Sequence, residues 1–532
     1  MPRTSTMAQL RRALRIAFYC ESSGVSPQEA IEAGREKIDR KRRSVITAIA
    51  ASAAAPLLGH APRSLAVPRF NGGVAIVGAG LAGLSCAYQL SAKGISAPVY
   101  EASSRVGGRC WSLRNFFPGQ VAERGGEFID TTHTTMRGFA NAFGLALEEV
   151  TKEPGEVAYY FDGRHYSEAQ VVEEFRQFVP AMKADLRDLG QPIADSFSQD
   201  DRRLDLTSLA DYLASRGAGP LIRQVIDVAY TIEYGLDISK QSCLNFLLFI
   251  HADRRSKFHP FGVFSDERFH VTEGNDAITQ GLANRLAGQI STDHKLVRAK
   301  RLSSGRVQLA FSVGGRTIES EHDAVILTLP FSVLRSVDLD PSLALPDWKT
   351  QAISEFQYGT NSKMMLGFTG RPWLTLHHSN GTSYSDLPNL QNTWETNPAL
   401  ATSASAILTH YSGAALGQSL LPAKVQTHAG SFLRDLEKIY PGASAQAARN
   451  AAGKYLAHVE NWSLNPLALG AYSCNAPGYF TSIAGNEAKP VGNLFFAGEH
   501  TDSFYAAQGF MEGAALSGLR AAAEVTTFLK HA

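Results

Sequence analysis

The sequence predicts an α/β fold organised around a dinucleotide-binding βαβ unit, and three observations support this. Residues 74–77 are four consecutive apolar residues, as expected of a parallel strand buried on both faces. A G-x-G-x-x-G motif follows at once, and the residues after it read as a helix that continues to Leu90. A second apolar run, 98–100, ends at Glu101, roughly twenty residues beyond the motif, where such units carry an acceptor for a ribose hydroxyl. A glycine turn in an ordinary α/β core is the alternative, but this context favours a Rossmann-type unit.

Each glycine of the motif has a physical purpose. Gly78 makes the tight turn, Gly80 lets the backbone approach a pyrophosphate, and Gly83 lets the helix pack closely on the strand. The helix would direct its N-terminus towards the pyrophosphate. Cofactor contacts are therefore expected from the turn and the first helical residues: Gly78, Gly80, Leu81, Ala82 and Gly83.

Composition narrows the class of protein. The chain has 532 residues, of which 44% are hydrophobic and 19% charged, which is ordinary for a globular protein with two substantial domains. The formal net charge of +1 gives no reason to expect nucleic acid or an anionic membrane as a partner. The five cysteines are scattered and lack metal-ligand spacing, so neither a metal site nor a disulfide framework is indicated.

Residues 1–66 are predicted to be an export signal and leader. Lys41-Arg42-Arg43 precedes the apolar run 45–58, which is too short and too rich in alanine to span a bilayer well. This pattern resembles a twin-arginine signal with small residues near Ala61 and Ala66 for cleavage, and it predicts a periplasmic or secreted protein. The alternative is an amphipathic or disordered extension of a cytoplasmic protein. In either case the fold is expected to begin near Gly72.

The middle of the chain predicts two insertions around further core strands. Residues 131–264 read as mostly helical, and a helix capped by Asn275 or Asp276 is expected to run to Leu286. Short strands are predicted at 295–299, 307–313 and 317–320, with a Gly314-Gly315 hairpin turn, and a buried strand at 324–329 ends at Pro330. In the second insertion, 337–461, the alternating run 356–368 predicts a strand on which Lys363 is the one cation.

Four further motifs give the chain a family resemblance. They are Glu101-Ala-Ser-Ser-Arg-Val-Gly-Gly-Arg109, Glu123-Arg-Gly-Gly-Glu-Phe128, Leu494-Phe-Phe-Ala-Gly-Glu-His-Thr501 and Gly509-Phe-Met-Glu-Gly-Ala514. Together they resemble the flavin-containing amine oxidases, which include monoamine oxidases, polyamine oxidases and L-amino-acid oxidases. The likeness spans about Gly72 to the C-terminus.

The resemblance implies non-covalent FAD in a discontinuous Rossmann-type domain made of residues 72–130, 265–336 and 462–532. Residues 131–264 and 337–461 would form an interleaved α+β substrate domain, a sheet with a helical insertion. Arg109 would neutralise the pyrophosphate, Glu499 would bind the ribityl or phosphate region, and the backbone of Val297 would contact the adenine. The full set of implied FAD contacts adds Glu101, Ala102, Gly125, Gly126, Glu127, Phe128, Gly498, Gly509, Phe510 and Met511.

The resemblance also implies catalytic residues. Lys363 matches a lysine that holds a water against the reactive nitrogen of the flavin, whereas spacing alone would favour a surface lysine. Tyr472 and Phe510 would form two aromatic walls around an amine. Ala471 stands where some members carry a cysteine bound to FAD, and Cys474 is out of register, which is why the FAD is expected to be non-covalent.

The function predicted is therefore that of an FAD-dependent oxidase, which converts an amine to an imine and reduces dioxygen to hydrogen peroxide. An L-amino-acid oxidase is the first alternative. Phe128 stands where the snake-venom type carries an arginine for the substrate carboxylate, which favours a plain amine. Arg124, Arg137 or a residue of the helical insertion could bind the carboxylate from another direction. A flavin desaturase or protoporphyrinogen-oxidase-like enzyme is the second alternative, and a module that retains FAD without turnover is the third.

The expected partners are a small-molecule amine and dioxygen. No nucleic acid and no stable membrane insertion are expected, and a homodimer is left open.

Overall fold

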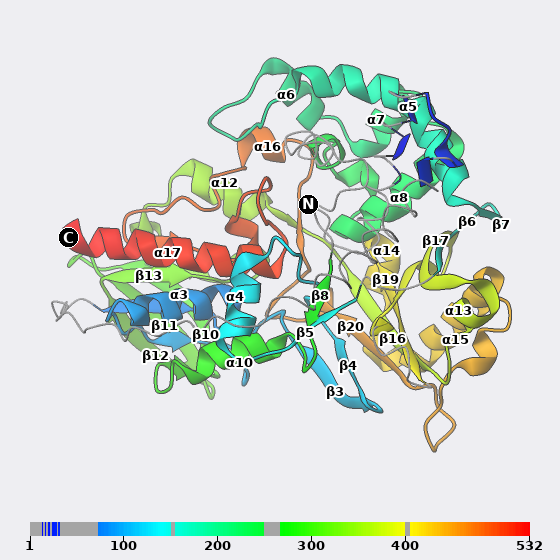
Figure 1. Ribbon diagram of the computed structural model, residues 1–532. Helices are drawn as coiled ribbons and strands as arrows, with labels where there is room; N and C mark the ends of the chain where they lie inside the picture. Colours follow the sequence, from blue (N-terminus) through cyan, green and yellow to red (C-terminus); the bar gives the residue numbers. More distant parts are fainter. Residues whose placement is uncertain are drawn as a thin grey trace, which may run out of the picture.

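The computed structural model of the protein describes residues 73–150, 155–248, 267–398 and 405–531, together with residues 13, 16–17, 20–21, 24–28 and 30–31. The predicted twin-arginine motif and its apolar run lie outside the described residues. Figure 1 shows a five-stranded sheet with the C-terminal helix on one side of the molecule, a larger sheet on the other, and a group of helices above both.

The first sheet has the order β22-β13-β1-β2-β9, and all of its pairs are parallel. Its central strands β1 (Val74–Val77) and β13 (Ala324–Leu327) are buried at every residue, which explains their uninterrupted apolar sequences. Helix α3 (Leu81–Ala92) follows β1, and α17 (Met511–His531) packs along it. The remaining strands are β2 (Val99–Tyr100), β9 (Ile290–Ser291) and β22 (Leu494–Phe496).

A four-stranded sheet of β12, β11, β10 and β14 extends from this unit. The predicted strands are confirmed as β10 (Lys295–Arg301), β11 (Val307–Val313) and β12 (Arg316–His322), and β14 is Asp338–Leu339. Gly314 and Gly315 have φ of 54° and 78°, as a tight hairpin turn of this kind requires. The predicted helix is α10 (Asp276–Asn284), with Asn275 as its N-cap residue.

The two insertions contribute to one seven-stranded sheet, in the order β20-β16-β19-β18-β17-β6-β7. Residues 131–264 are therefore less helical than predicted, because β5 (Leu147–Glu149), β6 (Glu156–Phe161) and β7 (Arg164–Tyr166) also lie there. The other members are β16 (Ser362–Phe368), β17 (Ser379–Leu387), β18 (Leu390–Glu395), β19 (Ala406–Ser412) and β20 (Ala457–Asn461).

Strand β16 is buried on both faces, yet its residues divide into two sets. Met364, Leu366 and Phe368 pack in one cluster with the apolar residues of α15 (Val425–Ile439). Met365 lies in a different cluster, with Phe117 of the β3–β4 hairpin. The alternation predicted for this strand therefore separates two buried faces, and Lys363 stands on the same face as Met365.

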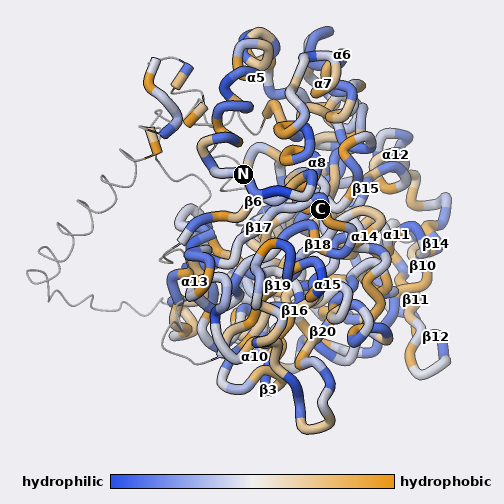
Figure 2. The backbone as a smooth tube through the Cα atoms, turned by 90° about the vertical axis from the view of Figure 1, so that its right-hand side faces the viewer, coloured by the Kyte–Doolittle hydropathy of each residue, from blue (hydrophilic) through white to orange (hydrophobic). Residues whose placement is uncertain are grey.

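The helical layer consists of α5 (Glu168–Asp188), α6 (Gln199–Asp205), α7 (Leu209–Ser215) and α8 (Pro220–Tyr234). Figure 2 shows apolar and polar segments alternating along α5 to α7, as in amphipathic helices. The apolar cluster that contains α5 also buries Ala13, Ile16, Ala17 and Cys20. Oε2 of Glu21 lies 3.9 Å from Nε of Arg176 in α5. Residues before Gly72 therefore also contribute to this apolar cluster, through a stripe at helical spacing that buries its apolar face.

Shorter elements connect these layers. No helix among the described residues is both long and apolar enough to cross a membrane. The connecting elements are β3 (Ser112–Phe117), β4 (Gln120–Glu123), α4 (Thr134–Ala142), β8 (Phe269–Val271), α11 (Phe331–Leu334), α12 (Asp347–Glu355), β15 (Gln357–Tyr358), α13 (Pro372–His377), α14 (Ala414–Ser419), β21 (Ser473–Cys474) and α16 (Tyr479–Ser482).

Close packing of α3 on the turn after β1 gives a first prediction. A Cβ on Gly83 would lie 1.9 Å from the carbonyl oxygen of Gly78, so Gly83→Ala must push the helix away from the turn. Such overpacking should lower the free energy of unfolding by about 1–3 kcal/mol, measured by chemical denaturation. The matched control is Gly138→Ala in α4, where a Cβ would meet nothing within 4 Å and stability should hold or rise. Equal effects of the two substitutions would contradict this prediction.

Candidate cofactor and substrate site

A cavity of about 540 Å³ opens at the carboxyl ends of the parallel strands. Its lining extends from Glu101, just after β2, to Tyr472 and Phe510. It includes residues that follow strands of the five-stranded sheet and residues within strands of the seven-stranded sheet. All of the cofactor and catalytic residues predicted from the sequence line it, except Gly83 and Val297. Gly83 instead contacts the turn after β1, and the two residues before Val297 line the cavity in its place.

The glycine turn at the end of β1 fits a pyrophosphate. Gly78 has φ of +106°, which favours glycine for conformational reasons. At Gly80, by contrast, the packing of the protein does not require glycine, because a Cβ there would meet no protein atom within 4 Å. Protein packing therefore leaves room at Gly80, on the cavity side of the turn, for a ligand to lie against the backbone.

Glu101 is held in a defined orientation at the same end of the cavity. It is buried, and Oε2 accepts a hydrogen bond from the backbone N–H of Ala79 at 2.7 Å. Oε1 accepts from the backbone N–H of Ser103 at 2.8 Å. Since a carboxylate offers about four lone-pair sites, capacity remains for a ribose hydroxyl.

Arg109 and Glu499 form an ion pair across the cavity wall, with Nη1 3.1 Å from Oε1. Arg109 ends the motif Glu101–Arg109 and Glu499 follows β22, so the pair joins two segments far apart in sequence. Helix α17 begins at Met511, and Gly509, Phe510 and Met511 all line the cavity near its N-terminus. The positive end of the helix dipole therefore faces the cavity.

The Gly125-Gly126 loop is fixed by contacts that only glycine permits. A Cβ on Gly125 would lie 1.7 Å from the carbonyl oxygen of Arg109, and one on Gly126 would strike the side chain of Met511. The amide of Asn275 donates to the carbonyl oxygens of Gly126 and Glu127, at 3.1 and 2.7 Å. The sequence identified Asn275 only as a helix cap, and its cap position gave no sign of these contacts.

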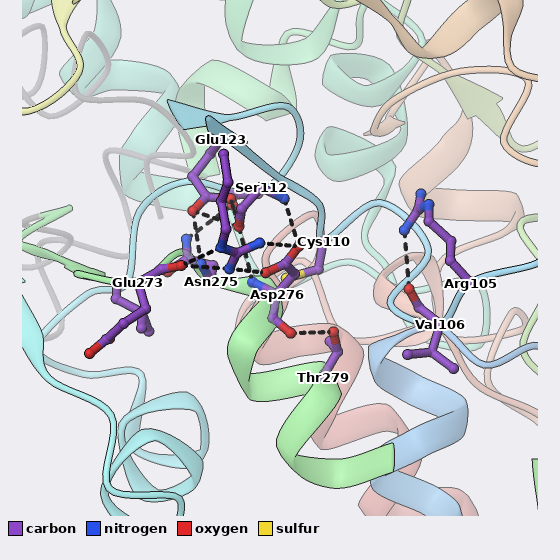
Figure 3. A network of polar contacts seen from close by, with 12 residues as sticks. Arg105, Val106, Cys110, Ser112, Glu123, Glu273, Asn275, Asp276 and Thr279 are labelled. Atoms are coloured by element: carbon purple, nitrogen blue, oxygen red, sulfur yellow. Dashed lines mark hydrogen bonds and ion pairs between the residues drawn. The ribbon is translucent and has the colours of Figure 1, made fainter. Parts of the chain in front are cut away.

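Below this loop lies a buried polar network, drawn in Figure 3. The carboxylate of Glu123 accepts hydrogen bonds from the hydroxyl of Ser112 and the backbone N–H of Asn275. Asp276 in turn accepts from the backbone N–H of Ser112. Burial raises the pKa of Glu123 to about 7, although these hydrogen bonds favour its charged form.

Lys363 is buried, with 7% of its surface exposed, so its interpretation as a surface lysine is wrong. Its Nζ donates to the carbonyl oxygens of Glu123 at 3.2 Å and Gly125 at 2.8 Å. The third contact is an ion pair with Glu127, 2.6 Å from Oε2. An ammonium has three N–H bonds, and all three have acceptors here.

Aromatic side chains surround the end of the cavity that contains Lys363. Tyr472 and Phe510 line it, as predicted, together with Phe128, Trp394 and Tyr411. The indole N–H of Trp394 donates to Oε1 of Glu127 at 2.9 Å. Trp394 and Tyr411 were missed by the sequence analysis, because aromatic residues in a strand are typical of a sheet core.

Tyr411 of this wall stays neutral. Burial is the main cause that raises the pKa of Tyr411, and nearby carboxylates, including Glu233 and Glu127, raise it further. A hydrogen bond between Tyr411 and Tyr472 acts in the opposite direction. The wall therefore offers ring faces and hydroxyl groups rather than charge.

Neither of the two arginines predicted as alternatives for binding a substrate carboxylate is an unpaired cation of the cavity lining. Arg124 lines the cavity, but its guanidinium pairs with Glu460 and lies 3.2 Å above the ring of Trp111. Arg137 donates to the carbonyl oxygen of Thr131 and is not among the lining residues.

No cysteine stands at the position expected for a covalent bond to FAD. Ala471 lines the cavity, whereas Cys474 is buried elsewhere. Cys110 does line the cavity, but its Sγ lies 3.8 Å from Sδ of Met511 and burial raises the pKa of its thiol well above the usual range. A thiol held in this form is a poor nucleophile.

Comparison with known proteins agrees with this arrangement. Residues 81–526 match the family described as flavin containing amine oxidoreductase. The L-amino-acid oxidase of Siganus canaliculatus is 27% identical to the chain, over 85% of this chain and 85% of its own length. The L-amino-acid oxidase of Pseudechis australis is 24% identical, over 85% of this chain and 86% of its own length.

Solved structures show the same fold. The cyclohexylamine oxidase of Brevibacterium oxydans IH-35A is similar with a TM-score of 0.73, and a putrescine oxidase bound to putrescine with 0.70. Both are 20% identical to the chain, and the likeness covers 86% of this chain and 99% of each structure.

The raised pKa of Glu123 predicts a pH dependence of stability. Between its ordinary value of 4.5 and about 7, the folded protein keeps this carboxyl protonated while the unfolded chain does not. The free energy of unfolding should therefore fall as pH rises through this window, by roughly 3 kcal/mol from this group. Glu123→Gln should flatten that slope in denaturation series at several pH values. The exposed Glu273→Gln serves as the control and should keep the wild-type slope, and an unchanged slope in Glu123→Gln would refute the assignment.

Proposed function

The chain belongs to the flavin-containing amine oxidoreductase family, and we propose that it is an oxidase with non-covalent FAD that acts on a plain amine and reduces dioxygen to hydrogen peroxide. One observation carries the proposal: a single cavity joins the dinucleotide-binding turn to an aromatic wall and a buried lysine. FAD retention alone requires neither the wall nor the lysine, which argues against a module without turnover.

The residues present fit FAD. The open space at Gly80 would accept the pyrophosphate, with the N-terminus of α3 and Arg109 to offset its charge. Glu101 would accept a ribose hydroxyl, and the N-terminus of α17 would face the isoalloxazine. Ala471 and the protonated thiol of Cys110 support a non-covalent cofactor.

The bound flavin supplies an acceptor for a hydride equivalent from the carbon next to the amine nitrogen. The chain must position that carbon and keep water away. Tyr472 and Phe510 would flank the amine, while Phe128 and Trp394 close the wall around it. The dipole of α17 would favour negative charge that develops on the acceptor.

A plain amine is favoured over an amino acid by the charges of the cavity. Among its described lining residues, the cations Lys363, Arg124 and Arg109 are each paired with a carboxylate. A substrate carboxylate would therefore have to compete with an existing ion pair. An L-amino-acid oxidase stays the second candidate, because the curated relatives are named so.

The test is a peroxide-coupled screen of purified protein against primary amines, diamines and L-amino acids. FAD should co-purify and be released by acid precipitation, and amines should give turnover with peroxide. Turnover of L-amino acids alone would establish the second candidate. Yellow colour that stays with the precipitated protein would contradict non-covalent binding.

Export through a twin-arginine route is a further proposal, supported by the sequence from Lys41 to Leu58. Replacement of both Arg42 and Arg43 by lysine should leave active enzyme inside the cell, because the route reads the arginine pair. Cell fractionation followed by the amine assay measures this. Full-length wild-type protein in the cytoplasm would contradict it.

A further inference from the structure

The N-terminus of α4 is capped by a residue from a different helix. The first four backbone N–H groups of an α-helix have no partner inside the helix. In α4, the N–H groups of His133 and Thr134 donate to carbonyl oxygens of the preceding turn, at 3.0 and 2.9 Å. Those of Thr135 and Met136 donate to Oε1 and Oε2 of Glu512, each at 2.8 Å. The side chain of the N-cap residue His133 makes no such bond, so Glu512 completes the cap.

Glu512 is suited to this role by its position. It has 3% of its surface exposed and belongs to the first turn of α17. Its carboxylate therefore lies at the N-termini of two helices, and each of these helix ends favours a negative charge. Helix α4 packs beside α17 (Figure 1), and Met136 and Phe139 of α4 share an apolar cluster with Ala515 of α17. The two helices are thus held together by apolar packing and by one shared carboxylate.

The capped end of α4 carries His133, which contacts the aromatic wall. The ring of His133 stands edge-on to that of Phe510, with the centroids 5.0 Å apart and 68° between the planes. Nδ1 of His133 accepts a hydrogen bond from the backbone N–H of Asp130 at 3.0 Å, which fixes the orientation of the imidazole. Phe510 lines the cavity and stands two residues before Glu512. One carboxylate therefore joins the helix that begins after His133 to the helix that begins after Phe510.

We propose that Glu512 is a positioning residue for the aromatic wall: it holds α4 on the first turn of α17, and α4, through His133, fixes the ring of Phe510 beside the amine. The inference rests on the proposed function, in which Phe510 flanks the amine. A ring contributes to binding only while it keeps the orientation that fits the substrate, and a small misplacement weakens the contact.

Other carboxylates near this helix end have different contacts. Asp502 lies 3.1 Å from the position that a Cβ on Gly513 would take, and its Oδ2 accepts a hydrogen bond from the backbone N–H of Ala507. Asp130 accepts from the backbone N–H of Glu267. Neither carboxylate takes the place of Glu512 at the first turn of α4.

The test is a double-mutant cycle on the holoenzyme. Affinity is measured for α,α-dimethylbenzylamine, which has no α-hydrogen to lose, from the change in the flavin spectrum. Glu512→Gln should weaken binding by about threefold to tenfold, because the amide accepts from one N–H group of α4 but presents its own donors to the other. Phe510→Leu should weaken binding as well. The double variant should bind no more weakly than Phe510→Leu, since Glu512 acts through that ring.

The matched control is Asp201→Asn. Asp201 is also buried and also accepts two backbone N–H bonds, from Gly190 at 3.0 Å and from Ser198 at 2.9 Å, but it does not line the cavity. This substitution should lower stability and leave the amine affinity unchanged. With benzylamine as substrate, Glu512→Gln should raise KM, whereas a mere loss of folded enzyme lowers turnover per milligram and leaves KM as it is.

A second variant keeps the test valid if Glu512→Gln does not fold. His133→Ala removes the ring contact with Phe510 while Glu512 stays, and it should weaken amine binding by a similar factor. Additive effects in the cycle, wild-type affinity in Glu512→Gln or His133→Ala, an equal loss in Asp201→Asn, or a wild type that does not bind the probe would overturn the inference. If the wild type oxidises amines in the peroxide screen but gives such a result, only this inference fails. If it oxidises no amine, the proposed function fails first.

Discussion

The buried ammonium of Lys363 is the interaction on which the site depends. It stands on β16 of the seven-stranded sheet, and its three acceptors belong to the segment 123–127, about 240 positions earlier in the chain. Burying a charge costs several kcal/mol unless its partners are complete, so this position is stable only while the two segments stay together. The lysine therefore connects the dinucleotide-binding unit to the sheet that carries the aromatic wall.

The interleaved chain makes this connection possible. Strands β1, β13 and β22 come from three separate stretches and meet in one parallel sheet, so their carboxyl ends gather motifs that are more than 400 positions apart. The chain leaves this unit twice, and both excursions add strands to the same second sheet. Strands of the two sheets alternate along the chain. The cavity between the sheets therefore forms only when the whole chain has folded.

The sequence predicted best what depends on local pattern. Runs of apolar residues gave β1 and β13, and paired glycines gave the β11–β12 hairpin. It failed where a side chain meets partners that are distant in the chain. Asn275 was predicted to be a helix cap, yet its amide holds the Gly126 and Glu127 carbonyls. Trp394 was not singled out, yet its N–H donates to Glu127. The burial of Ala13 to Cys20 was not predicted for the same reason, because these residues pack in a cluster with α5, far along the chain.

Charge pairing also explains how the curated relatives and the cavity can suggest different substrates. A family shares the cradle for its cofactor, because pyrophosphate and ribose are the same in every member. Substrate choice depends instead on a few side chains at the aromatic end. There Phe128 is apolar, Arg124 is held by Glu460, and Glu127 balances Lys363, so the described wall has no net positive charge to offer a carboxylate. An ammonium group, by contrast, meets ring faces and a carboxylate with unused lone pairs, and this difference in pairing is the basis on which a plain amine is proposed as the substrate.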